Sequence, residues 1–551
     1  MQTVRRLYLY AMSGITFGVL AVGLDQLLVA ILGQLGVGRG PFGGDQGYGE
    51  QLSLAMALVG VGLPVWAIHW WVAQRGRQAG RPHADEERAS TVRALYLTVV
   101  LAVLLGFGAS SGVELLRIAL NGLAGGGSGD YFFGDPAGAV ATLTVTALGW
   151  GYHVAVRRSD MAAGPHAGAS AWLPRVYLYG AALTGLLVAL QSIGDLVTLV
   201  VEIALPSANG FEDGQFRASR AADFSSTALV WGVVWIGHWW YAHRLTRDPG
   251  WRGASERPAR LRQAFFVAVI LAAAASVLRL GSEALRAVLV PVLGASEALG
   301  SPDGRDLLRA VLAALVAAIP WGLAWWVHGR WMRRESALPD DPGRVDSAVR
   351  LDLHAVAFVG LAFGAVGAAW LLGLLVDVLL GGDRTSGGDG YWRVELAGFA
   401  AYAGLGLLVW GWKWWQARAR QAADPVGEAR STVRRSFLLM VLAGSVVAGL
   451  GSLAVVLYRL FGSLLGASLF GNTASELSTP LGILIVAVAV GLYHGLALRG
   501  DLDLHAEATA PTEAAPSRRH LVLVGPPGSE LGETLDALRG GLPDGYRLDE
   551  G

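Results

Sequence analysis

The sequence predicts an all-α, polytopic membrane protein of about twelve transmembrane helices, and three observations support this fold class. Of the 551 residues, 53% are hydrophobic and 16% are charged, whereas soluble proteins carry about 25% charged residues. Long apolar stretches recur along the chain, and about 20 residues suffice to cross a bilayer. A Trp-x-x-His motif ends most of these repeats at a nearly constant period. Together these features indicate a tandem array of helical hairpins in a membrane.

The repeated unit is a pair of helices whose second member ends in the motif. Successive motifs are 84, 85, 90, 85 and 81 residues apart, and a fixed period of this kind indicates duplicated structural units. We therefore predict six two-helix repeats, at 1–85, 86–165, 166–250, 251–340, 341–425 and 426–500. The motif residues are Trp66/His69, Trp150/His153, Trp235/His238, Trp325/His328, Trp410/Lys413 and Gly491/His494.

Each repeat contains two apolar stretches that are long enough to form transmembrane helices. The first of each pair opens at an arginine, and the second closes with one. Small residues at spacings of four and three, such as Gly360, Gly364 and Gly367, predict a close approach between neighbouring helices. We place the helices near 5–35, 51–75, 92–122, 137–158, 173–204, 222–245, 261–293, 306–334, 347–381, 393–418, 432–466 and 477–498.

The distribution of arginine predicts the orientation. Arginines flank the junctions between repeats, while the glycine-rich loops within repeats carry few; 121–138 carries none. By the positive-inside rule the junctions are cytoplasmic. Both termini are then cytoplasmic, and all six repeats point the same way.

The C-terminal segment differs from the repeats. Residues 501–519 form a polar linker, and 520–551 predict a small cytoplasmic α/β-like tail with strands at His520–Val524 and Tyr546–Leu548 and a helix at Ser529–Leu538. The turn at Gly525–Glu530 begins like a phosphate-binding loop but has Glu530 where that loop needs lysine. We therefore predict no nucleotide binding.

The repeat motifs also carry a resemblance. Arg-x-Leu-Tyr-Leu-Tyr starts (Arg5–Tyr10) and Trp-x-x-His-Trp ends (Trp66–Trp70) resemble an uncharacterised bacterial multipass membrane family called domain of unknown function 5671. The resemblance covers roughly residues 1–500, in about six tandem copies. It implies a bacterial membrane setting and supplies no catalytic residues.

Three interpretations of the Trp-x-x-His motif stay open. In the first, the motif is an interfacial anchor, with Trp66 in the headgroup zone and His69 bonding to lipid, water or a loop. In the second, histidines on different helices bind a haem or a metal. In the third, the histidines handle protons or anions near neutral pH. The fifth repeat replaces histidine by Lys413, a poor axial ligand. We therefore expect anchoring, with no cofactor and no metal.

Acidic side chains near the other end of the helices are the second set of candidates. Asp25, Glu114, Asp195 and Glu283 each follow an arginine by 20 or 21 residues, which is about 30 Å along a helix. Glu114 and Glu283 have arginines within about one turn, so we expect ion pairs there. Asp25 and Asp195, with Glu202 seven residues further on, have no such partner and are candidates to face a cavity.

Three classes of function follow from these features. We favour a structural, sensory or scaffold membrane protein, because no constellation of residues demands chemistry. The alternative is a transporter or channel in which Asp25 and Asp195 share an interior cavity. The second alternative is a haem-binding membrane protein. The net charge is zero, so charge gives no argument for nucleic-acid binding, and the absence of cysteine excludes disulfides and thiolate sites. The lipid bilayer is the partner that we expect from the sequence, with no nucleic acid and no nucleotide, and the sequence does not identify protein partners.

Overall fold

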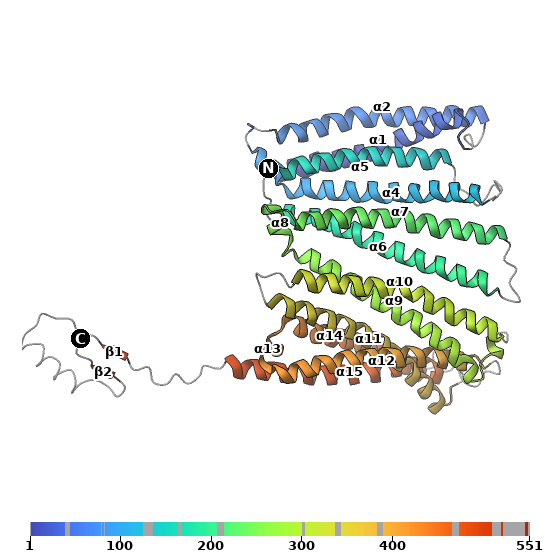
Figure 1. Cartoon of the computed structure of the whole chain (residues 1–551), viewed down its shortest axis with the longest axis vertical. Helices are drawn as coiled ribbons and strands as arrows, with labels where there is room; N and C mark the ends of the chain where they lie inside the picture. The colour runs from blue at the N-terminus through green and yellow to red at the C-terminus, as the bar shows by residue number, and fades with distance from the viewer. Residues whose placement is uncertain are drawn as a thin grey trace, which may run out of the picture.

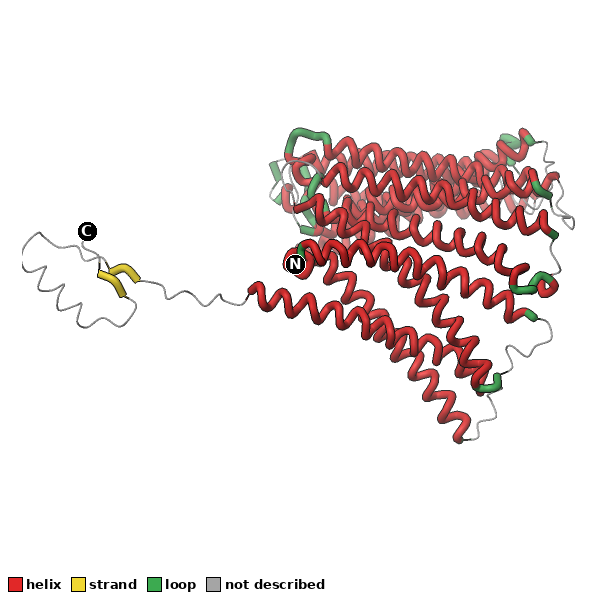
Figure 2. The backbone as a smooth tube through the Cα atoms, turned by 60° about the horizontal axis from the view of Figure 1, so that its bottom comes forward, coloured by secondary structure: helices red, strands yellow, loops and turns green. Residues whose placement is uncertain are grey.

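Most of the chain forms long helices that pack side by side. In a computed structural model, the described residues are 2–38, 44–78, 80–81, 83–124, 136–162, 168–206, 214–299, 303–336, 343–382, 390–465, 473–509, 519–521 and 546–548. Apart from short loops at the helix ends and two strands, these residues are helical (Figure 2).

The helices fall into three successive groups, each with four long helices and one short helix. The first group is α1 (Gln2–Gln34), α2 (Gly44–Gly76), α3 (Ala84–Arg88), α4 (Thr91–Leu123) and α5 (Pro136–Ala162). The second is α6 (Ala169–Ala204), α7 (Gly214–Thr246), α8 (Trp251–Glu256), α9 (Arg260–Val292) and α10 (Gly304–Ser336), with a 3-10 turn at Glu297–Leu299. The third is α11 (Gly343–Leu379), α12 (Tyr391–Ala423), α13 (Pro425–Arg430), α14 (Thr432–Leu464) and α15 (Thr473–Thr509).

Eleven of the long helices are long and apolar enough to cross a membrane. The twelfth, α7, is equally long but carries Arg217, Arg220 and Asp223 in its first three turns, which lowers its mean hydropathy. A multi-helix membrane protein is therefore supported. Helices α1 and α4 lie close to their predicted positions, whereas α2 and α7 begin earlier than predicted, at Gly44 and Gly214. Helix α15 continues to Thr509, into the segment predicted as a linker.

The three groups form an open row (Figure 1), from α1 and α2 at one end to α14 and α15 at the other. Within each group the first long helix packs on the second and the third on the fourth. Neighbouring groups are joined because α4 packs against α6 and α7, and α9 packs against α11 and α12. The second group thus contacts the first group on one side and the third group on the other.

One end of the helices carries the N-terminus and the short helices α8 and α13 (Figure 1). Asp424 helps α13 to begin there, because its carboxylate accepts a hydrogen bond from the backbone N–H of Gly427 at 2.9 Å and Pro425 occupies the first turn. We call this end the arginine face, after the arginines near the start of the first helix of each hairpin: Arg6, Arg93, Arg175, Arg262, Arg350 and Arg434.

Glycine allows α11 and α12 to approach each other closely. On α11, a Cβ at Gly364 would lie 2.9 Å from Leu407, and one at Gly367 would lie 2.3 Å from the backbone nitrogen of Ala403 on α12. On α12, a Cβ at Gly406 would lie 2.2 Å from the nitrogen of Gly364. The backbones of α11 and α12 therefore touch, as the glycine spacing predicts.

The C-terminal tail is described only in part. Strands β1 (Arg519–Leu521) and β2 (Tyr546–Leu548) pair in parallel. The second predicted strand coincides with β2, and the first overlaps β1. The helix predicted at Ser529–Leu538 lies outside the described residues. Two three-residue strands do not support an α/β-like tail.

Candidate functional site

The predicted acidic candidates lie in four different helices and do not converge. Asp25 on α1 is half-buried and accepts a hydrogen bond from the Thr142 hydroxyl of α5 at 2.6 Å. It lines a cleft of about 630 Å³ between α1, α4 and α5. Asp195 on α6 is also half-buried and accepts from the side chain of Gln191 at 3.0 Å. Asp195 does not line the cleft of Asp25, so the two aspartates share no cavity there.

The three glutamates of this set are in ion pairs. Glu114 pairs with Arg117 at 2.7 Å, and Glu283 pairs with Arg279 at 2.5 Å, both within one helix as predicted. Glu202 pairs with Arg220 of α7 at 2.8 Å. That last pair joins α6 to one of the polar residues of α7, which the sequence analysis did not foresee.

The motif histidines make a consistent set of contacts. In His69, His153, His238, His328 and His494, Nδ1 lies 2.7–2.8 Å from the carbonyl oxygen four residues earlier. In the first three, Nε2 lies 3.1–3.3 Å from a tyrosine hydroxyl, of Tyr8, Tyr96 and Tyr177 respectively. His153, His328 and His494 are buried, so protein surrounds these rings. The motif residues Trp66, Trp150, Trp235, Trp325, Trp410 and Lys413 are half-buried. Because the helices alone do not fix the membrane boundary, the anchoring role stays a prediction.

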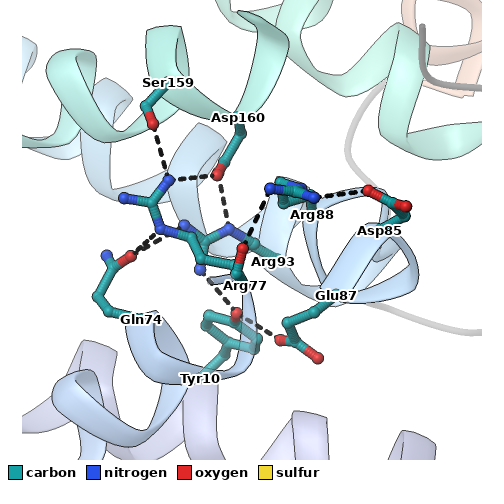
Figure 3. A network of polar contacts seen from close by, with 9 residues as sticks. All are labelled: Tyr10, Gln74, Arg77, Asp85, Glu87, Arg88, Arg93, Ser159 and Asp160. Atoms are coloured by element: carbon teal, nitrogen blue, oxygen red, sulfur yellow. Dashed lines mark hydrogen bonds and ion pairs between the residues drawn. The ribbon is translucent and has the colours of Figure 1, made fainter. Parts of the chain in front are cut away.

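The sequence analysis missed a polar cluster that lies at the arginine face of the first group (Figure 3). Arg6 of α1 donates to Glu87 of α3 at 2.7 Å, and the Tyr10 hydroxyl donates to the same carboxylate at 2.7 Å. Arg93 of α4 donates to the Tyr10 oxygen at 2.9 Å and to Asp160 of α5 at 2.7 Å. One chain of contacts thus joins α1, α3, α4 and α5.

The second group repeats this network. Arg175 and Tyr179 of α6 donate to Glu256 of α8 at 2.7 and 2.6 Å. Arg262 of α9 donates to the Tyr179 oxygen at 3.2 Å and to Glu335 of α10 at 2.7 Å. The tyrosine hydroxyl therefore has the same position between a glutamate and an arginine in both groups.

The third group keeps the ion pairs and loses the tyrosine. Arg350 of α11 donates to Glu428 of α13 at 2.8 Å, and Arg434 of α14 donates to Asp501 of α15 at 2.7 Å. His354 stands where the other groups have tyrosine, four residues after the first arginine. Its Nε2 and the Nη1 of Arg434 are both buried without a hydrogen-bond partner among the described residues. The bridge between the two ion pairs is missing here.

Burial makes these networks important for stability. The side chains of Arg93, Arg262 and Arg434 are at most 2% exposed, and each guanidinium also lies over the ring of a tryptophan that follows the motif: Trp70, Trp239 and Trp414. A buried ion that loses its partner costs about 3–5 kcal/mol. The arrangement neutralises each charge with an internal partner, so it can stabilise the helix ends.

A sequence signal for these networks existed. The first arginine and the glutamate of the short helix are 81, 81 and 78 residues apart, and the second arginine and its acidic partner are 67, 73 and 67 residues apart. Among the described residues no three His, Asp or Glu side chains are grouped so that they could hold a metal ion.

The comparisons with known proteins agree with a division into three groups. The family model described as domain of unknown function (DUF5671) matches residues 6–150, 175–323 and 350–489. Comparison with curated proteins and with solved structures finds no match. Each matched copy spans the four long helices of one group, so the prediction of six family copies is wrong. The two hairpins of a copy differ, because among the described residues a short helix with a network glutamate follows only the first of them. The chain thus belongs to the DUF5671 family, as three tandem copies.

Proposed function

We propose that this protein is a structural, sensory or scaffold protein of a bacterial inner membrane. In this proposal all twelve long helices cross the bilayer, as six hairpins of one direction, and both termini and the small C-terminal tail are cytoplasmic. The two-helix repeats at 1–85, 86–165, 166–250, 251–340, 341–425 and 426–500 remain part of it as a subdivision of the three copies. The motif tryptophans and histidines help to position the helix ends at the cytoplasmic interface.

The observation that supports a structural role most strongly is the buried network at the arginine face. Its acidic and basic side chains form ion pairs with one another: Glu256 binds Arg175 and Tyr179, and Glu335 binds Arg262. A transport or catalytic site needs groups that can change partners, whereas a buried ion pair with complete hydrogen bonding is stable in one arrangement. The short helices α3, α8 and α13 each contribute one glutamate. In the first two copies a tyrosine, Tyr10 or Tyr179, links this glutamate to the arginine of the second hairpin and so ties the two hairpins together.

A transporter or channel is the second candidate, and Asp25 is the observation that favours it. A half-buried carboxylate beside an apolar cleft is costly, and such residues are functional candidates by default. Against this role, Asp25 already has Thr142 as a partner, and Asp195 lies in another copy.

Haem ligation by the motif histidines is the weakest of the three candidates. In His69, His153 and His238 both ring nitrogens face a protein oxygen, so an iron would have to displace a tyrosine. An absorption spectrum of protein purified from cells supplied with haem tests this directly. A Soret band that disappears in His153→Ala would support haem binding.

Ion flux separates the first two candidates. The purified chain is reconstituted in liposomes, and fluxes of H⁺, Na⁺, K⁺ and Cl⁻ are measured with entrapped dyes against protein-free liposomes. A structural role predicts no added flux in wild type, Asp25→Asn or Asp195→Asn. A flux that the wild type shows and Asp25→Asn abolishes, while Glu114→Gln keeps it, would overturn the proposal in favour of transport.

A further inference from the structure

The junction between the first and second copies contains an amphipathic cleft. Helices α4, α5, α6 and α7 line a volume of about 680 Å³, most of which faces apolar side chains such as Leu104, Leu143 and Val233. Towards the arginine face the lining becomes polar, with Arg157, Arg158 and Tyr241. A smaller cleft of about 130 Å³ adjoins it, shares Arg157 and Tyr241, and adds Arg252 of α8. One end of the combined cleft is thus apolar and the other is cationic.

Among the described residues, three arginines at this end, Arg157, Arg158 and Arg252, have no acidic partner. Arg157 is half-buried; its Nη2 donates to the carbonyl oxygen of Pro174 at 2.8 Å, and its guanidinium lies 5.5 Å from the ring centre of Tyr177. Arg252 donates to the carbonyl oxygen of Met161 at 3.2 Å. Among the described residues, neither arginine has a carboxylate oxygen within 4.0 Å, and the same holds for Arg158. Glu256 lines the smaller cleft, but it is buried and bound to Arg175 and Tyr179.

The cleft also departs from the repeat. Arg157 stands seven residues after the motif tryptophan of α5, where α10 has Met332 and α15 has Leu498. Met332 is 4% exposed and belongs to an apolar cluster that includes Ala348 of α11. The second junction, between the second and third copies, therefore has an apolar side chain in its core. The first junction, between the first and second copies, has a guanidinium in a cleft at the same position.

Two glycines widen the same cleft. Gly151 of α5 and Gly237 of α7 line it, and a Cβ on either would meet nothing within 4 Å. The corresponding positions at the second junction are Trp326 of α10 and Trp412 of α12. The first junction thus has two glycines and an arginine where the second has two tryptophans and a methionine. All three differences make room for an apolar ligand with a negatively charged end.

We propose that the cleft between the first and second copies binds a phospholipid with an anionic headgroup. The acyl chain occupies the apolar volume beside Gly151 and Gly237, and the phosphate lies at Arg157, Arg158 and Arg252. Arginine suits this role because its planar donors match phosphate oxygens, and basic pockets between transmembrane helices on the cytoplasmic side bind anionic headgroups. This inference rests on the proposed membrane orientation, but it does not depend on which of the candidate functions is correct.

Native mass spectrometry of the full chain in detergent tests the site. Phosphatidylglycerol and phosphatidylcholine with identical acyl chains are compared, and glycerol phosphate is added as a competitor without acyl chains. Wild type should prefer phosphatidylglycerol, and Arg157→Met, which copies the residue of the second junction, should reduce that preference about fivefold, since one arginine near a membrane surface contributes about 1 kcal/mol. Gly237→Leu should weaken both lipids alike, because it fills the apolar part. Arg75→Met removes an exposed arginine whose guanidinium lies over Trp71 and should change neither.

Three outcomes would overturn the proposal. An unchanged lipid preference in Arg157→Met would show that this arginine binds no headgroup. Unchanged lipid binding in Gly237→Leu would show that no acyl chain occupies the cleft. Competition by glycerol phosphate at the same concentration as phosphatidylglycerol would identify a soluble anion as the ligand. Helical content and unfolding midpoints equal to those of Arg75→Met ensure that losses of binding are not losses of fold.

Discussion

Removal of the Tyr179 hydroxyl tests whether the buried network stabilises the second copy. Tyr179→Phe preserves the ring and its packing against Phe265 at 5.9 Å. It removes the one atom that lies 2.6 Å from Glu256 and 3.2 Å from Arg262. The Glu256 carboxylate keeps Arg175, and Arg262 keeps Glu335, so the ion pairs remain while the link between them is lost.

The expected cost follows from these two hydrogen bonds. A hydrogen bond to a charged group contributes about 1.5–3 kcal/mol, and a buried group that is left without a partner costs a similar amount. Because the bond to Arg262 is long, we expect Tyr179→Phe to lower the free energy of unfolding by about 2–4 kcal/mol. Unfolding is measured by titration with sodium dodecyl sulfate in mixed micelles, followed by circular dichroism at 222 nm.

Tyr402→Phe is the matched control. Tyr402 of α12 stacks on Phe363 with ring centres 5.4 Å apart, and its hydroxyl makes no hydrogen bond with the described residues. This variant should unfold like the wild type. A loss below about 0.5 kcal/mol in Tyr179→Phe, or an equal loss in both variants, would refute the view that the hydroxyl bridge stabilises the copy.

Three further predictions concern the third copy and the membrane orientation. His354→Tyr restores the hydroxyl of the other copies beside the unpartnered Nη1 of Arg434, so it should raise the free energy of unfolding by about 1–2 kcal/mol in the same titration; no gain would mean that the histidine is already satisfied there. Gly364→Leu should destabilise strongly, because even its Cβ lies 2.9 Å from Leu407, whereas Gly404→Leu, with nothing within 4 Å, should be tolerated; equal midpoints for the two would contradict the close α11–α12 contact. An alkaline phosphatase fusion at Gly294 should be active and one at Asp424 inactive, because the arginine face is proposed to be cytoplasmic; the reverse activities would invert the topology.

The sequence predicted the class of fold well because that information is local. Twenty consecutive apolar residues must form a helix in a bilayer, since every backbone group needs a partner within its own segment. The regular spacing of Trp-x-x-His is also local information, and it indicated duplicated hairpins. Arginines at the helix ends indicated where the helices begin and end. The polar first half of α7 weakens this signal, and its pairing on α6 depends partly on the contact of Arg220 with Glu202.

Only the tertiary structure decided which residues form the polar networks and what surrounds the histidines. Arg6 and Glu87 are 81 residues apart, and no local pattern shows that a short helix brings them together. The number of copies was predicted wrongly for the same reason. A hairpin looks like a complete repeat in sequence, but the polar network of the first copy needs residues from two hairpins and from the short helix between them. Burial of His153 against Tyr96 likewise depends on how α4 and α5 pack, because the same motif at a helix end suits both a lipid interface and a protein core. The chain's composition therefore determined that it forms membrane helices, and the packing of those helices determined which charges became partners.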